Sequence, residues 1–413
     1  TTGVSNVGVG YRSLTGNTTG GYNVGVGQQT LTANSTGASN TAIGHTSMIS
    51  NTTGASNVAM GSQALKANTE GNYNSAFGAD ALLLTTTGAQ NTGLGWRALR
   101  ANTTGGYNTS VGSNALYSST IGINNVAIGS SALFYNTEGN YNVAVGSSSL
   151  FNNTTGIYNT GIGQGALNGN TTATGNTATG FICLQQTTTG GYNSGYGYQC
   201  LQANTTGTYN TTMGYQTYNN LTTGSNNVGI GRSVTASAVD VSAEITIGSN
   251  IAGGGTNTVR IGTAAGTATL GLDGSDTSWA AASDARLKKD VKTSTVGLSF
   301  IQELRPVTFK WEQKDKIDST LPQYDAESSE PVFGEGNAHH GFIAQEVKAV
   351  IDGNTDVVNG HNIWHQDPDG TQQVAPAALV PMLVKAVQEQ AALVEKQAAL
   401  IEALTARISA LEK

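Results

Sequence analysis

The sequence predicts a mainly β protein: a parallel β-solenoid (β-roll) of 17-residue coils, then a small α+β domain that ends in a coiled-coil helix. Three observations predict this fold class. A glycine recurs at one constant spacing, from Gly10 through Gly27 and onward to Gly248, without one insertion. Residues 1–282 hold only six Lys/Arg and seven Asp/Glu, whereas residues 283–413 hold thirteen and nineteen. Residues 389–413 contain neither glycine nor proline.

The repeat reads approximately Thr-Thr-Gly-x-Tyr-Asn-Val-Ala-Ile-Gly-x-x-Ala-Leu-x-x-Asn. Its glycines disfavour a short helical hairpin. Its apolar residues alternate, so that Val126 and Ile128 share a face, and Gly/Asn/Thr turns separate them from the next segment. A fixed period of such short strands predicts a solenoid over residues 1–250, with about fifteen coils stacked ~4.8 Å apart.

Two polar columns run through the repeat. Asparagine precedes the motif glycine by four residues in the first fourteen coils, from Asn6 to Asn227. Stacked asparagines form hydrogen-bonded ladders, which we favour over a ligand site. Tyrosine stands one position earlier in seven coils, either as a turn-packing ladder, which we favour, or as a stripe that stacks on sugars: Tyr22, Tyr73, Tyr107, Tyr141, Tyr158, Tyr192 and Tyr209.

Cys183 and Cys200 are one repeat apart, in the column that is alanine in many coils. We interpret them as small buried residues. Neighbouring coils would also bring their Cα atoms within disulfide range, so a disulfide remains the alternative.

Residues 251–282 are predicted to be a connector. The strands at Ile245–Gly248 and Val259–Gly262 follow each other at an interval shorter than one repeat, as if the coil narrows. The stretch that follows is rich in Gly, Ala and Thr, as expected for an accessible segment before residue 283.

The second domain begins with Ser283-Asp284, ahead of Arg286-Leu287-Lys288-Lys289. On these residues alone the serine is a helix N-cap with an acid in the first turn. Three further motifs follow in order, at Leu304–Phe309, Gly341–Val347 and Leu379–Glu389. Together with Ser283–Asp290 they resemble, in order and spacing, the peptidase S74 intramolecular chaperone domain of bacteriophage tail spikes and fibres, including endosialidases.

The resemblance implies a trimeric folding clamp over residues 283–386 that cuts itself off by single-turnover autoproteolysis at the Ala282–Ser283 bond. It implies Ser283 as nucleophile and Lys288 as general base, a Ser-Lys variant of the serine-protease arrangement. The family's histidine maps onto His340, with adjacent His339 as the alternative. Five residues along a helix span about 140°. Ser283 must therefore lie on an extended entry to the helix or be placed by a neighbouring subunit.

Residues 387–413 are predicted to form a parallel trimeric coiled coil, in preference to a solvent-covered single helix. Side chains at alternating spacings of three and four form a heptad seam, in which two glutamines could fix register and strand number: Val387, Gln390, Val394, Gln397, Ile401, Leu404, Ile408 and Leu411.

Several functions are excluded or disfavoured. A net charge of −7 without a basic cluster argues against nucleic acid, and no 18-residue apolar run is present, so we expect no membrane insertion. The repeats offer almost no acid for calcium binding or glycoside hydrolysis. His361 and His365 have helical spacing but lie in a turn-rich segment, so we expect no metal site, and no cofactor is expected.

The predicted function is a bacteriophage tail fibre or spike, a homotrimer in the virion that binds a host receptor, expected to be a glycan, through residues 1–250. The alternative is a bacterial cell-surface trimeric adhesin with the same self-cleaving chaperone. The repeats also resemble the head repeats of trimeric autotransporter adhesins. A third hypothesis is an ice-binding surface. Because the chain opens within a repeat, we expect it to be a C-terminal fragment.

Overall fold

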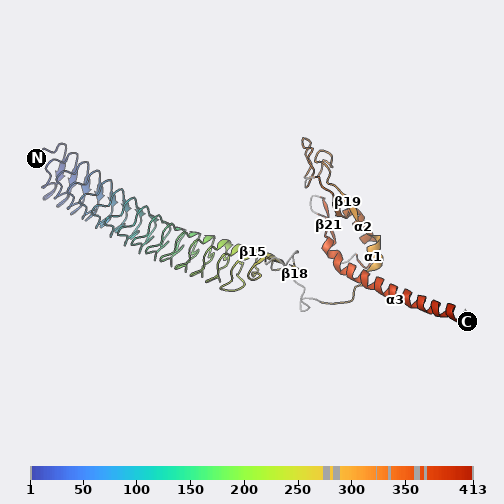
Figure 1. The fold of residues 1–413 in the computed structure, drawn as a ribbon. Coiled ribbons are helices and arrows are strands. Elements are labelled where there is room, and N and C mark those ends of the chain that lie inside the picture. The colour runs from blue at the N-terminus through green and yellow to red at the C-terminus, as the bar shows by residue number, and fades with distance from the viewer. Residues whose placement is uncertain are drawn as a thin grey trace. The chain divides into compact units, whose positions relative to one another are not determined.

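The computed structural model describes residues 2–272, 280–281, 289–321, 323–333, 336–357, 363–366 and 370–411. Contacts within the chain divide it into two compact units, Thr1–Ser283 and Asp284–Lys413. Each unit is described by itself below (Figure 1).

The first unit is a parallel β-solenoid, as the 17-residue period predicts (Figure 1). Each coil contributes one strand, which pairs in parallel with the strand of the next coil, as in Val126↔Val143. The solenoid strands are β1 (Val7–Val9), β2 (Val24–Val26), β3 (Thr41–Ile43), β4 (Val58–Met60), β5 (Ser75–Phe77), β6 (Thr92–Leu94), β7 (Thr109–Val111), β8 (Val126–Ile128), β9 (Val143–Val145), β10 (Thr160–Ile162), β11 (Thr177–Thr179), β12 (Ser194–Tyr196), β13 (Thr211–Tyr215), β14 (Val228–Arg232), β15 (Glu244–Ser249) and β16 (Thr258–Thr263).

The motif glycine is required by the way one coil stacks on the next. Gly129 has φ +132°, a conformation that L side chains rarely adopt. A Cβ atom at Gly129 would lie 2.7 Å from the carbonyl carbon of Gly146 in the following coil. No side chain fits there, which explains why the glycine recurs in every coil.

Small side chains fill the inside of each coil. The middle residue of each strand points inward, and Ala127 and Ala144 are completely buried, together with a leucine column that includes Leu133. The apolar pair Val126 and Ile128 does share a face, and that face is the outer one: Ile128 is 41% exposed. The strands therefore present an apolar surface away from the coil interior.

The predicted asparagine ladder is confirmed. Asn125 accepts the backbone N–H of Asn142 at 3.0 Å through Oδ1, and its own N–H donates to Asn108 Oδ1 at 3.0 Å. Its Nδ2 donates to the carbonyl of Gly139 at 2.8 Å. Each buried amide thus satisfies backbone groups that the short strands leave without a partner.

A second asparagine ladder lies in the column three residues before the Thr-Thr-Gly glycine, where Asn153 Nδ2 donates to Asn136 Oδ1 at 2.7 Å. Because each amide donates to the preceding coil, a coil without asparagine leaves the previous Oδ1 without a donor. Among the described residues this happens where the next coil carries Thr85, Ser119, Thr187 or Leu221, and the buried oxygens without a partner belong to Asn68, Asn102, Asn170 and Asn204.

The first ladder ends at Glu244, which occupies the position of the ladder asparagine and is completely buried. Its N–H still donates to Asn227 Oδ1 at 2.9 Å. Its carboxylate accepts the N–H groups of Ser237 at 3.3 Å and Gly255 at 2.9 Å. A carboxylate only accepts hydrogen bonds, so it suits a place where the backbone N–H groups of Ser237 and Gly255 need acceptors and the next coil has no ladder asparagine.

The predicted connector carries strands. β16 pairs with β15 in parallel at the shortened interval seen in the sequence, Ile245↔Val259. The chain then reverses, and β17 (Gly266–Gly271) and β18 (Ala280–Ala281) add to the sheet in antiparallel pairs. Both cysteines are free thiols and completely buried, in agreement with their interpretation as small core residues.

The second unit combines short helices with two two-stranded antiparallel sheets, β19–β20 and β21–β22. Its described apolar core includes Phe300, Val347, Ile351 and Leu379. The elements are α1 (Leu298–Glu303), β19 (Val307–Phe309), β20 (His339–Gly341), α2 (Ala344–Gly353), β21 (Trp364–Gln366), β22 (Gln372–Val374), the 3-10 helix η2 (Pro376–Leu379) and α3 (Val380–Leu411).

The long helix α3 includes the predicted seam, whose apolar side chains are all exposed within one chain; Ile401, for example, is 64% exposed. By length and composition alone, the helical stretch Pro376–Leu411 could cross a membrane: an 18-residue window has a mean hydropathy of 1.3 and is 11% buried. A helix that pairs with copies of itself satisfies the same criteria, so this is weak evidence, and the absence of membrane insertion stays a prediction.

The break in the second ladder predicts a stabilising substitution. In Thr85→Asn, the new amide would donate to Asn68 Oδ1, which now has no donor, and should add about 1 kcal/mol of stability. We expect a higher unfolding temperature, measured by circular dichroism of the full chain. Thr87→Asn, the same change at an exposed neighbour, should have no effect. A lower unfolding temperature for Thr85→Asn would contradict this account of the ladder.

Candidate functional site

Three of the predicted site residues, Ala282, Ser283 and Lys288, lie outside the described residues. Their roles therefore stay predictions. The described part of the predicted site comprises the two histidines and the three motifs downstream.

His340 lies in the middle of β20, opposite Thr308 of β19. Its Nδ1 is 3.3 Å from Thr308 Oγ1, and the side chain is exposed. A contact at Nδ1 orients the ring and leaves Nε2 as the ring nitrogen that does not take part in it.

His339 is adjacent in sequence but lies on the other face of the strand, because side chains alternate along β20. Its ring packs against Phe309 at 5.8 Å and Trp311 at 6.4 Å between ring centroids. Its Nε2 is buried without a hydrogen-bond partner among the described residues. The sequence analysis favoured His340 and kept His339 as the alternative, and the fold gives His339 a packing position and His340 an accessible one.

An ion pair joins two of the sequence motifs. Arg305, just before β19, donates from Nε to Glu346 Oε2 at 3.0 Å and from Nη2 to Glu346 Oε1. This bidentate geometry is the strong form of a carboxylate–arginine pair. The hydrogen bond from Arg305 lowers the pKa of Glu346, and Glu346 in turn raises the pKa of Arg305. The pair holds the start of α2 beside the β19–β20 sheet.

A second carboxylate joins the last motif to α1. Glu389 Oε2 of α3 accepts the backbone N–H of Leu298 at 2.8 Å, at the first turn of α1. Lys385 lies 3.4 Å from the same carboxylate. The hydrogen bond from Leu298, and to a smaller degree Lys385, lowers the pKa of Glu389. Sequence reasoning assigned Glu389 no role, because its partner is 91 residues away.

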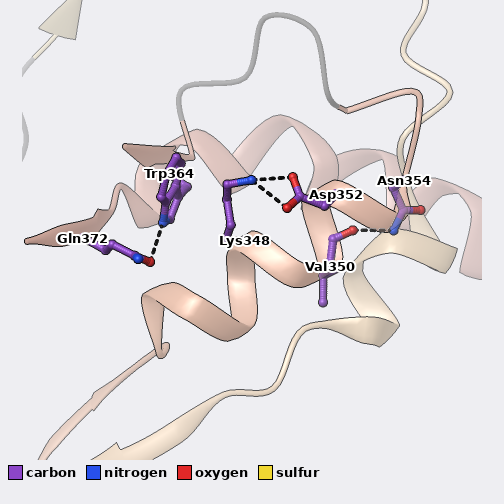
Figure 2. A network of polar contacts seen from close by, with 6 residues as sticks. All are labelled: Lys348, Val350, Asp352, Asn354, Trp364 and Gln372. Atoms are coloured by element: carbon purple, nitrogen blue, oxygen red, sulfur yellow. Dashed lines mark hydrogen bonds and ion pairs between the residues drawn. The ribbon is translucent and has the colours of Figure 1, made fainter. Parts of the chain in front are cut away.

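Figure 2 shows how the end of α2 is held. Lys348 Nζ bonds both oxygens of Asp352, at 2.5 and 2.6 Å, and lies 5.1 Å from the ring centroid of Trp364 in β21. Trp364 Nε1 donates to Gln372 Oε1 at 3.2 Å, which ties β21 to β22. Asn354 Nδ2 donates to the carbonyl of Val350 at 2.8 Å. We interpret this network as structural support for α2.

A groove of about 700 Å³ lies between β19, the start of α2 and β22. Aromatic and amide side chains line it, including Trp311, Phe333, Gln345 and Gln372. The described residues contain no group of three or more His, Cys, Asp or Glu that could hold a metal ion. His361 lies outside them, and His365 is in β21 rather than in a helix.

One comparison with known proteins found a match in the second unit. Residues 283–356 match the family model Peptidase_S74, described as chaperone of endosialidase. No curated protein and no solved structure matches the chain. The match begins at Ser283 and includes the two motifs that Arg305 and Glu346 join. It implies a self-cleaving chaperone domain of the peptidase type after the β-solenoid, an architecture like that of tail fibres.

The two carboxylates predict an acid-sensitive C-terminal unit. Because the pKa values of Glu346 and Glu389 are lowered on folding, their stabilisation is complete above the ordinary glutamate pKa and disappears as the pH falls through the lowered values. We expect the helical circular dichroism signal to melt earlier below about pH 4. The double variant Glu346→Gln, Glu389→Gln should lose much of this dependence, and Glu402→Gln, at an exposed site on α3, should retain it.

Proposed function

We propose that this chain is one subunit of a homotrimeric fibre whose C-terminal unit assembles the β-solenoid and then cuts itself off between Ala282 and Ser283. The observation that carries the proposal is the family match, which starts at Ser283, where the charge-poor repeats give way to a charged unit. Two exposed apolar surfaces support the homotrimer.

The first surface is the outer row, the residue directly before the motif glycine in each solenoid strand. Its side chains point away from the coil interior and are mostly apolar: Val9, Val26, Ile43, Met60, Phe77, Leu94, Val111, Ile128, Val145, Ile162, Thr179, Tyr196, Met213, Ile230, Ile247 and Ile261. A continuous apolar stripe of this length is typical of a surface that another protein covers. In the proposed trimer the other two solenoids cover it.

The second surface is the seam of α3. Val380 and Leu383 extend it upstream with the same spacing, so it begins within the chaperone unit. In each of its last two heptads isoleucine and leucine occupy the two seam positions: Ile401 and Leu404, then Ile408 and Leu411. This pattern favours two strands in isolated coiled coils. The family match supports three strands, and the rest of the unit would then have to decide the strand number.

The proposed chemistry uses the Ser283 hydroxyl. Its oxygen attacks the Ala282 carbonyl carbon while Lys288, in its neutral form, takes the proton. The peptide bond breaks, the acyl group passes to Ser283 Oγ as an ester, and the amine of Ser283 gains a proton. Water then hydrolyses the ester and leaves a carboxylate on residue 282. His340 is proposed to relay protons through Nε2, while its contact with Thr308 holds Nδ1.

The fibre is proposed to belong to a phage virion and to bind a host-surface glycan through residues 1–250. The family description, chaperone of endosialidase, supports the phage origin. The alternative is a bacterial surface adhesin, which the Asn-x-x-x-Gly repeat favours. Electron microscopy of the assembled parent particle, with antibodies to the solenoid, would distinguish a virion from a cell envelope.

Denaturing gels test the cleavage. The wild-type chain should give fragments of residues 1–282 and 283–413, and Ser283→Ala should give one intact band. Lys288→Met should also block cleavage, because it removes the proposed general base.

The two histidines provide a matched pair for the same gel. His340→Ala should slow cleavage at least about tenfold, as removal of a proton-transfer group does. His339→Gln keeps the aromatic packing position partly filled and should cleave normally once folded. Intact wild-type chain after trimer formation would refute the self-cleavage proposal.

A charge in the seam tests whether assembly precedes cleavage. In Ile401→Asp, three buried carboxylates would meet at the seam, so we expect loss of the trimer by light scattering and loss of cleavage. Ala406→Asp introduces the same residue on the opposite side of the helix and should preserve both. A cleaved monomer of Ile401→Asp, or a wild-type dimer, would contradict the proposal.

A further inference from the structure

The tyrosine column contains stacked and isolated members. Tyr141 stacks on Tyr158 with ring centroids 5.1 Å apart, and Tyr192 stacks on Tyr209 at 5.2 Å. A ring within such a pair presents one face to its neighbour, so that face is unavailable to a ligand. Tyr107 differs, because its column neighbours are Gln90 and Asn124. Among the described residues no aromatic ring stacks on it, and 63% of it is exposed.

A shallow hollow of about 460 Å³ lies beside Tyr107. The column next to the tyrosines changes there from Gly106, without a side chain, to Ile123 in the following coil, which forms a step. The backbone of Ile123 is held by Asn140 Oδ1 at 2.7 Å, which fixes this wall. The hollow is lined by Thr87 and Thr104, Gly106 and Ile123, and Tyr107 and Asn124.

We propose that this hollow binds one pyranose ring of an uncharged glycan. An aromatic ring with an open face packs against the C–H groups of a sugar, while hydroxyl and amide groups beside it can bond the sugar hydroxyls. Thr87, Thr104 and Asn124 provide those groups around Tyr107. The lining contains no charged residue.

Two exposed glutamates, one or two coils from the hollow, affect whether it favours charged or uncharged sugars. Glu70 lies one coil before Thr87 in the same column, and Glu138 lies two coils after Thr104, both exposed. Neither a lysine nor an arginine lines the hollow to compensate them. Their negative charges disfavour sialic and uronic acids at this position. The site thus favours uncharged sugars over acidic ones.

This site specifies the receptor-binding role proposed above and rests on it. The test is an array of neutral and acidic oligosaccharides, probed with the wild-type chain and three variants. Tyr107→Asn inserts the residue of the next coil, and Gly106→Ile fills the hollow with the residue that the next coil carries. Tyr73→Asn is the control, because among the described residues no aromatic ring stacks on Tyr73 either, but its neighbour Asn72 fills the adjoining place and accepts the Ala55 N–H at 2.7 Å.

We expect the wild-type chain to bind neutral glycans. Tyr107→Asn and Gly106→Ile should each weaken that binding about tenfold, as loss of an anchoring aromatic contact does, and Tyr73→Asn should leave it unchanged. Absence of neutral binding, preference for acidic glycans, or equal effects of all three variants would overturn the proposal. Denaturing gels of the same proteins keep the tests separate: a chain that cleaves but binds no neutral glycan refutes only this site.

Discussion

The first unit depends on direct backbone stacking of each coil on the next. Parallel pairing at a constant offset leaves no space for a side chain at the motif glycine, where a Cβ atom would collide with the next coil. It also leaves short strands whose flanking backbone groups need partners, and the buried asparagines supply them. One inserted residue would shift every later coil relative to its neighbour. The constant period is therefore a consequence of stacking.

The second unit is held together by contacts distant in sequence. Arg305 and Glu346 join the sheet to α2, and Glu389 joins α3 to the first turn of α1. Its described core is small, and its longest helix exposes most of its apolar seam. Such a unit is expected to gain much of its stability from association with other copies.

These two modes of construction fit the proposed division of roles. A solenoid consists of non-local strand pairs, which form slowly because chain closure precedes the contacts that compensate it. A separately folding unit that brings three chains together would lower that cost. In the proposed scheme the formed solenoid would no longer need the chaperone unit, and removal of that unit would leave a solenoid that is stable for kinetic reasons. In this scheme the cut should follow assembly.

The tyrosine and asparagine columns show how a repeat can vary without losing its fold. Thr85 and Ser119 interrupt the second ladder, and each leaves one buried oxygen without a donor. Gly106 and Tyr107, in columns where the side chain varies from coil to coil, line a local hollow. Interior changes thus affect stability, whereas changes in the exposed columns are available for binding.

The sequence by itself determined the parallel solenoid, its 17-residue coils, the asparagine ladder and the long seam-bearing helix, because these follow from periodicity. It placed Val126 and Ile128 on one face, but only the folded coil decided that this face is the outer one, since alternation does not say which side is closed. The resemblance favoured His340 and kept His339 as the alternative. Pairing with β19, a strand far earlier in the chain, gave them opposite environments. The catalytic roles of Ser283 and Lys288 rest on the family resemblance, because neither periodicity nor strand pairing indicates which residue is a nucleophile and which is its base.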